Sequence, residues 1–203
     1  MSRYPNDHLP FRTRPEDAHL DAPLVKLPSG VMVTMLPLAD SAAPLLENSA
    51  MLRASLTRVD AIEALEAFGL ELCPLAVLHE MASVGIWIPP ATLVHDAYDQ
   101  AHMSSLGYKQ EHDRRCWGEL AKRGIGPDTV WSLARPIFNF GKTHKAMEVG
   151  GKPAPENGDN AMGGWDTTDD GRPNFIQAGT GANHRGEASR FVDYGTNVYG
   201  CAR

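Results

Sequence analysis

The amino-acid sequence predicts an α+β fold, with a helical N-terminal two-thirds and a C-terminal third of short antiparallel strands and ordered loops. Two observations lead to this prediction. Helical spacing of apolar residues, together with capping residues, recurs between positions 43 and 135. After Gly141 the chain is rich in glycine, asparagine, aspartate and threonine, its aromatic residues are spaced apart, and no 3.6-residue period remains. We therefore expect two regions of different character within one fold.

The elements of the first half are expected in this order. Alternation across residues 31–35 predicts a short strand that Pro37 ends. Residues 43–53 are compatible with a helix. A second helix is expected after Ser55 as its N-cap, because apolar residues follow at a spacing of three and Gly69 suits the C′ position.

The middle of the chain continues this alternation of helix and strand. Residues 72–81 predict a short helix with a proline near its start, and residues 84–88 (VGIWI) predict a buried strand that two prolines end. The longest helix is expected within 92–123. A short helical segment then restarts at 126–128, and 137–140 reads as a strand.

Composition and charge exclude several classes of protein. The chain has 203 residues, of which 42% are hydrophobic and 22% charged, which excludes wholesale disorder, collagen and coiled coil. With a formal net charge of −6, the chain lacks the excess of positive charge that proteins use to bind duplex nucleic acid, so we expect no nucleic-acid partner. No apolar run approaches the roughly 20 residues of a membrane helix, and no apolar signal segment occurs in residues 1–28. We therefore expect no membrane span and a cytoplasmic location, with release by lysis or in a phage particle as alternatives.

The chain is expected to form one domain behind an arm. Residues 1–28 are rich in proline and charge, which predicts an extended arm that is ordered only where it packs on something, such as a second copy in a homo-oligomer. Residues 29–203 are expected to form a single α+β domain. The candidate site is expected within 137–203, because loops held by a scaffold concentrate function.

The cysteines predict neither a disulfide framework nor a zinc knuckle. There are three, Cys73, Cys116 and Cys201, and no CxxC pair occurs. This usage suits a reducing compartment.

Two clusters of polar residues could carry chemistry. In the glycine-rich end of the chain, Asp193 could fix the tautomer of His184, so that the other ring nitrogen acts as a base, and Tyr194 could polarise a carbonyl. The alternative is a loop histidine with a turn aspartate. Residues 141–145 (GKTHK) offer Lys142 and His144, which could bind an anion or place a general base; the alternative is a solvated basic turn. The first glycine that a phosphate-binding P-loop requires is missing, which excludes that motif.

The segment 199–203 (YGCAR) resembles the nucleophile loop of L,D-transpeptidases, which cross-link or trim peptidoglycan peptides. In that family a histidine stands two residues before the cysteine, where this chain has Tyr199. The resemblance implies that Cys201 is a nucleophile and that His184, at a family-like interval upstream, is its base. The alternative is a cysteine that is merely free.

A second resemblance spans most of residues 55–200. Members of a family of uncharacterised bacterial proteins carry G-H-K-K, Y-G-W-H, P-I-Q-P-L, a histidine and D-Y-S-H-G, in that order. The matching segments here are 59–62 (VDAI), 111–113 (EHD), 141–145 (GKTHK), 164–166 (GWD), 171–177 (GRPNFIQ), His184 and 193–196 (DYGT). Asp166 stands in place of the histidine of Y-G-W-H, and Gly195-Thr196 in place of Ser-His. The resemblance implies one site that gathers Lys142, His144, Trp165, Gln177, His184, Asp193 and Tyr194, and it names no substrate.

Together these features predict a hydrolase or transferase that acts on an amide bond, with a peptide of the bacterial cell wall as the favoured substrate. The candidate catalytic residues are His184, Asp193, Tyr194, His144 and Cys201, and the candidate substrate-binding residues are Lys142, Trp165 and Gln177. No cofactor is expected; a zinc-dependent variant would use His144, His184 and Asp193 as ligands. Residues 111–113 (EHD) are interpreted as a solvated helix face. The alternative function is a non-catalytic interaction or assembly module, for example in a phage particle.

Overall fold

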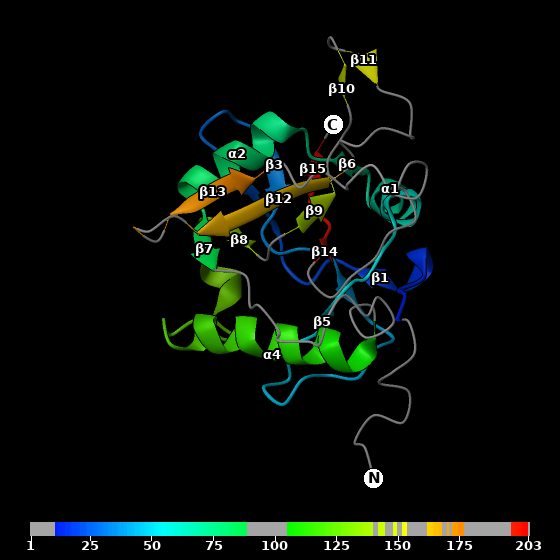
Figure 1. Cartoon of the computed structure of the whole chain (residues 1–203), viewed down its shortest axis with the longest axis vertical. Helices are drawn as coiled ribbons and strands as arrows, with labels where there is room; N and C mark the ends of the chain where they lie inside the picture. The colour runs from blue at the N-terminus through cyan, green and yellow to red at the C-terminus, as the bar shows by residue number, and fades with distance from the viewer. Residues whose placement is uncertain are drawn as a thin grey trace.

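In the computed structural model, strands are spread along the described part of the chain, and the described helices lie among them between residues 15 and 132 (Figure 1). The structure describes residues 11–88 and 105–139, together with the shorter segments 142–144, 148–149, 152–153, 162–167, 170, 172–176 and 196–202.

The first half of the chain is rich in strands, so the prediction of a helical N-terminal two-thirds is wrong. Seven strands precede residue 89: β1 (Ala18–His19), β2 (Leu24–Lys26), β3 (Met32–Thr34), β4 (Ala39–Asp40), β5 (Leu52–Arg53), β6 (Leu70–Leu72) and β7 (Ile86–Ile88). Each is only two or three residues long, which is too short to display the two-residue period by which a strand is recognised. The fold is therefore mixed, with strands spread along the chain.

Three α-helices are described, and local capping explains their bounds. Helix α1 (Arg58–Ala67) begins after Thr57, whose hydroxyl accepts the Asp60 backbone N–H at 3.2 Å, so the expected Ser55 cap is two residues early. The helix ends where expected, at Gly69, which has a φ of +70°. Helix α2 (Leu75–Val84) follows Pro74, and α4 (Leu106–Ala121) follows Ser105, whose hydroxyl accepts the Tyr108 backbone N–H.

Three of the strands predicted from the sequence are present, and one predicted helix is a loop. The expected helix over 43–53 is wrong, because this stretch is a loop that ends in β5. The strands expected at 31–35, 84–88 and 137–140 are confirmed as β3, β7 and β8 (Ile137–Asn139). Two short 3-10 helices complete this part, η1 (Pro15–Asp17) and η2 (Val130–Ser132).

A four-stranded sheet in the order β2-β3-β15-β6 organises the fold. Its third member, β15 (Gly200–Ala202), comes from the C-terminal end of the chain and pairs antiparallel with both β3 and β6. A second four-stranded sheet, β13-β12-β9-β14, is built from the last third of the chain. Smaller sheets join β1-β4-β5, the parallel pair β7-β8, and β10 (Glu148–Val149) with β11 (Lys152–Pro153).

The C-terminal segment lies between two hydrophobic clusters. Val198 packs with Leu56 and other residues of one cluster, and the next residue, Tyr199, belongs to the other. Tyr199 is fully buried, its ring stacks on Phe138 with centroids 5.4 Å apart, and its hydroxyl donates a hydrogen bond to the Ile137 carbonyl at 3.0 Å. Because neighbouring residues of an extended segment face opposite sides, this one segment joins both halves of the core.

The described part of the expected arm belongs to the same core. The Thr13 backbone N–H donates to the Ser55 carbonyl at 3.0 Å, and β2 pairs along its length with β3. Val25 and Leu27 are buried in the first cluster. Residues 11–28 therefore pack on this chain itself.

Candidate functional site

The second four-stranded sheet brings together segments that are far apart in the sequence. Strand β9 (Lys142–His144) pairs antiparallel with β12 (Met162–Thr167), where Lys142 is opposite Gly164. On its other side β9 pairs in parallel with β14 (Thr196–Asn197), where Lys142 is opposite Thr196. Strand β13 (Pro173–Ile176) closes the outer edge beside β12. Figure 1 shows these strands lying side by side in front of the body of the protein.

The register assigns the candidate residues of this sheet to two faces. Successive residues of a strand alternate between faces, so positions 142 and 144 belong to one face together with their partners 164 and 162. Position 165 pairs with Phe175 and belongs to the other face. The sheet therefore places Lys142 and His144 together, and it does not place Trp165 on the same face.

Four of the predicted site residues lie outside the described residues: Gln177, His184, Asp193 and Tyr194. The pairing of His184 with Asp193, and the metal triad that adds His144, stay predictions. In the sequence, β14 begins two positions after Tyr194. The strand that follows the Asp193–Tyr194 motif is thus paired with the strand that carries Lys142 and His144.

Cys201 forms a disulfide with Cys73, which corrects the expectation of free cysteines. Cys73 follows β6 directly, Cys201 lies in β15, and these two strands are paired, which brings the Cα atoms to 5.2 Å. Both residues are buried. A sulfur in a disulfide carries no thiolate, and the thiolate is the nucleophile. Cys201 in this bonded state is therefore a structural residue, and the resemblance to the L,D-transpeptidase loop does not extend to its chemistry.

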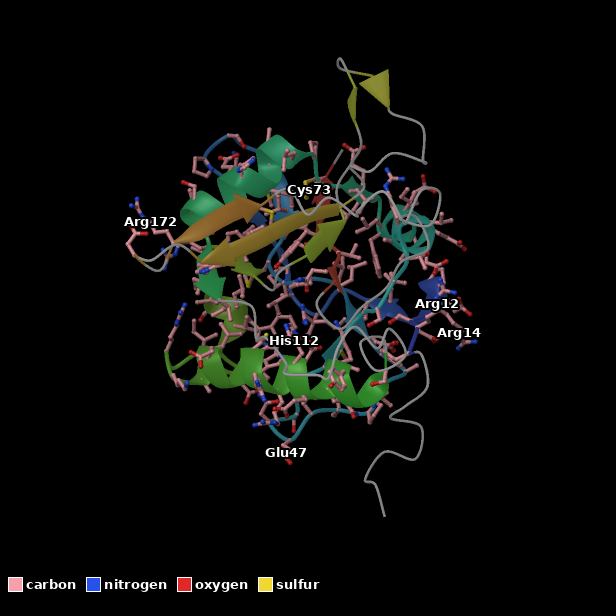
Figure 2. All side chains as sticks on the ribbon, in the orientation of Figure 1. Arg12, Arg14, Glu47, Cys73, His112 and Arg172 are labelled. Carbon is pink, nitrogen blue, oxygen red and sulfur yellow. A yellow bond between two sulfur atoms is a disulfide. The ribbon has the colours of Figure 1, made fainter. Side chains whose placement is uncertain are left out.

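A group of polar residues is buried where α4 packs against the strands. We call Arg53, Lys109, His112, Asp113 and Asn197 the buried charged cluster; each is at most 5% exposed. Figure 2 shows His112 on the inner side of α4 and Glu47 at the periphery.

Asp113 is the centre of this cluster. One of its carboxylate oxygens accepts the Arg53 backbone N–H at 2.8 Å, and the other accepts the Arg53 Nε at 2.8 Å. Lys109 Nζ lies 3.8 Å from Asp113 Oδ1. The Arg53 guanidinium also donates from Nη2 to His112 Nδ1 at 2.7 Å and from Nη1 to the side-chain oxygen of Asn197. One arginine thus connects β5, α4 and β14.

The protonation states of the cluster follow from burial and from these charges. Burial alone would raise the pKa of Asp113, but Arg53 and Lys109 outweigh it and hold the pKa well below its usual range. Burial, reinforced by the Arg53 charge, lowers the pKa of His112 to about 4. His112 is therefore neutral at neutral pH, and its Nδ1 accepts from Arg53. Burial raises the pKa of the nearby Cys116 thiol to about 12, which leaves it protonated and unreactive.

This arrangement suits positioning better than proton transfer. At neutral pH the carboxylate stays ionised, the imidazole stays neutral and the thiol stays protonated. None of the three therefore has a pKa near neutral pH, as a general acid or base requires. What the cluster does is fix Asn197, and with it β14, against α4 and β5. It supports the strand that is paired with Lys142 and His144.

Sequence reasoning missed this cluster because residues 111–113 read as a solvated face. Only Glu111 is on the outside, where its carboxylate accepts from Arg114 and Arg115 at 2.9 and 2.6 Å. A signal was present: Lys109, Asp113 and Cys116 fall at i, i+4 and i+7, one face of a helix, and Leu120 continues that face. Charged residues on an otherwise apolar face, i and i+4 apart, indicate a buried ion pair.

Within the described part of the chain, no three His, Cys, Asp or Glu side chains are grouped so that they could hold a metal ion. None of the helices described here is both long and apolar enough to cross a bilayer. Comparison of the chain with protein-family models, with curated proteins and with solved structures gave no match.

Proposed function

We propose that the chain is a hydrolase or transferase that acts on an amide bond, with a peptidoglycan peptide as the favoured substrate. One observation supports this most directly: β9, which carries Lys142 and His144, pairs in parallel with β14, which follows Asp193 and Tyr194 in the sequence. The residue types needed for amide chemistry, an ammonium, an imidazole, a carboxylate and a phenol, thus occur on adjoining segments.

In the proposed reaction His184 is the general base, oriented by Asp193. It takes a proton from water, or from an acceptor amine in a transfer reaction, as that nucleophile attacks the carbonyl carbon. Tyr194 donates a hydrogen bond to the developing oxyanion. The protonated His184 then gives its proton to the leaving amine as the C–N bond breaks. Lys142 binds a substrate carboxylate and His144 assists.

The proposal uses no thiol. Because Cys201 is bonded to Cys73 and Cys116 is buried with a raised pKa, the attacking group is water or an amine rather than a thiolate. Trp165 and Gln177 are kept as substrate contacts; position 165 belongs to the sheet face opposite Lys142, so it would contact a different part of the substrate. In a zinc-dependent form, His144, His184 and Asp193 would be the ligands.

The disulfide also supports a substrate outside the cytoplasm. Disulfides persist in oxidising compartments and are rare in the cytosol, and wall peptides lie on the oxidising side of the membrane. Fractionation of cells that make the native protein distinguishes this compartment from the cytoplasmic location expected from the sequence.

The experiment is a turnover assay on purified muropeptides, read by mass spectrometry. Hydrolysis adds the mass of one water across the cleaved bond, whereas transfer joins the acyl fragment to an added amine. We expect His184→Ala and Asp193→Asn to abolish turnover with little change in melting temperature. The matched control is His79→Ala, since His79 is exposed on α2. Treatment of the native protein with iodoacetamide should leave turnover unchanged.

Two results would refute this proposal. If the wild-type protein shows no turnover with or without added zinc, the chain is not this enzyme, and the non-catalytic assembly module becomes the better interpretation. If turnover survives in His184→Ala, His184 is not the general base. If alkylation abolishes turnover, a thiol takes part and attack by water or an amine is wrong.

A further inference from the structure

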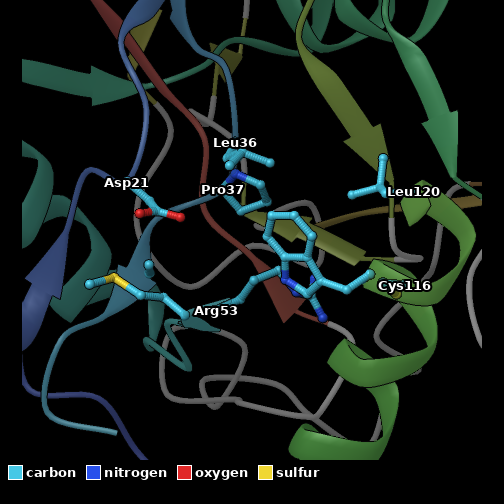
Figure 3. Close-up of a pocket in the computed structure, with 9 residues that line it drawn as sticks. Asp21, Leu36, Pro37, Arg53, Cys116 and Leu120 are labelled. Atoms are coloured by element: carbon cyan, nitrogen blue, oxygen red, sulfur yellow. The ribbon is translucent and has the colours of Figure 1, made fainter. Parts of the chain in front are cut away.

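The two faces of the sheet β13-β12-β9-β14 are distinguished by Asn197, the residue of β14 that belongs to the buried charged cluster. Its side-chain oxygen accepts from Arg53 Nη1, and Figure 3 shows the Arg53 side chain reaching from β5 toward α4. Asn197 is paired with Thr143 of β9, so both belong to the face turned toward this cluster. Since neighbouring residues of a strand alternate between faces, Lys142 and His144 belong to the opposite face.

The same register places an acidic residue on the face that holds Lys142. Gly164 of β12 is opposite Lys142, and β12 continues two residues further to Asp166. A spacing of two returns to the same face, so Asp166 is a diagonal neighbour of Lys142. Diagonal neighbours on antiparallel strands lie about 7–8 Å apart, which is within the reach of long side chains. The two opposite charges are therefore close enough to bind one small group together.

The glycine beside this pair suits the approach of a ligand. Gly164 is paired on both sides, with Lys142 on β9 and with Ile176 on β13, so it lies inside the sheet. Glycine weakens the interior of a strand, and it often marks a bulge or a place where a ligand comes close to the backbone. The pairing of β12 runs through Gly164 without an extra residue in any of these three described strands, which excludes a bulge here.

Two neutral polar residues complete this face. Asn174 of β13 is directly opposite Asp166, and Thr196 of β14 is directly opposite Lys142, so both belong to the same face. An amide and a hydroxyl can hydrogen-bond a ligand without cancelling either charge. The face thus combines one cation, one carboxylate and two neutral hydrogen-bonding residues.

We propose that this sheet face binds an α-amino-acid group in its zwitterionic form. Lys142 binds the carboxylate of that group and Asp166 binds its ammonium, through charge-assisted hydrogen bonds. The inference rests on the proposed function, in which Lys142 binds a substrate carboxylate. It restricts the substrate to an amide whose carboxylate-bearing residue also keeps a free α-amine, which means a residue that is joined to the rest of the peptide through its side chain.

Titration of the isotope-labelled full chain, followed by the NMR shifts of its backbone amides, tests the proposal with three matched probes. Nε-acetyl-lysine carries both charges, Nα,Nε-diacetyl-lysine keeps only the carboxylate, and Nε-acetyl-lysine amide keeps only the ammonium. Each is used as the racemate, because placement on a sheet face does not fix the hand of the ligand. We expect the first probe to bind about tenfold or more tightly than either of the others, with shifts centred on β9 and β12.

Two charge variants should give reciprocal results. In Asp166→Asn the zwitterionic probe should bind no more tightly than the probe with the carboxylate alone, and Asp166→Glu should keep the preference for two charges. In Lys142→Met the zwitterionic probe should bind no more tightly than the probe with the ammonium alone. Asp128→Asn is the matched control for lost charge, because Asp128 is exposed and belongs to none of these strands. Melting temperatures show which variants are folded, and the wild-type comparison and Lys142→Met decide the matter if Asp166→Asn does not fold.

Equal binding of the three probes, or shifts confined to other strands, would overturn the proposal. So would a lower melting temperature of Asp166→Asn with an unchanged preference, since Lys142 and Asp166 would then form only an ion pair within the sheet. The titration needs no turnover, so it separates this site from the proposed function. A chain that binds the zwitterionic probe but cleaves no muropeptide has the site without the reaction. A chain that cleaves muropeptides but does not distinguish the probes has the reaction without this site.

Discussion

The disulfide between Cys73 and Cys201 should dominate the stability of this chain. It closes a loop of 128 residues and fixes the C-terminal strand β15 beside β6. For a loop of this length the chain-entropy relation predicts a stabilisation of about 5 kcal/mol, because the cross-link removes conformations from the unfolded chain. Domains of this kind have a total stability of about 5–15 kcal/mol. Replacement of both cysteines by alanine should therefore remove between about a third and all of the folding stability.

Urea denaturation followed by circular dichroism measures this effect. The double variant should unfold at a much lower urea concentration than the wild type, and the dependence of its unfolding free energy on urea should be steeper, because an unfolded chain without the cross-link exposes more surface. The control is Cys116→Ala, which removes a buried sulfur that belongs to no disulfide.

Thiol titration in denaturant provides the chemical check. The unreduced chain should show one reactive thiol, that of Cys116, and the reduced chain should show all three. Three thiols before reduction, or a loss of stability no larger than that of Cys116→Ala, would refute the assignment of the disulfide as the main cross-link of the fold.

Three further predictions concern packing and charge. Asp113→Asn should cost about 3–5 kcal/mol of unfolding free energy in urea denaturation, since it leaves the buried Arg53 charge without its partner. The free energy of unfolding should fall by about 3 kcal/mol as the pH drops from 6.5 to 4, because His112 stays neutral in the folded state while the same histidine takes up a proton in the unfolded chain. A pH series of denaturation midpoints measures this loss. Gly85→Ala should destabilise the fold, since its Cβ would collide with the Met81 carbonyl oxygen. Gly118→Ala has open space around it in α4 and should stabilise the fold by up to about 1 kcal/mol; thermal melts compare the two variants.

Each of these predictions has its own contrary result. A loss below about 1 kcal/mol in Asp113→Asn would mean that the ion pair is solvated, as exposed pairs are. The contribution of His112 is fully present above the ordinary histidine pKa and is lost below it, so an acid profile that is unchanged in His112→Gln would assign the loss to other groups. Equal melting temperatures for the two alanine variants would contradict the close packing around Gly85.

The sequence predicted the elements whose signals lie within a few residues of one another. The end of α1 at Gly69, the start of α2 after Pro74, and strands β7 and β8 all follow from local caps, prolines and apolar runs. For the site, the sequence singled out Lys142 and His144, and only the sheet register brings them beside β14 and separates them from Trp165. His184, Asp193 and Tyr194 stay predictions from the sequence.

Sequence alone thus determined the positions of the capped helices and of the apolar strands, because those depend on contacts within a turn or a short run. Tertiary structure alone decided that Cys201 meets Cys73, that two-residue strands pair, and that the inner face of α4 is buried with its charges. The physical reason is the same in each case. A disulfide, a strand pairing and a buried carboxylate each require a partner from elsewhere in the chain, and for Asp113 that partner is Arg53 on β5.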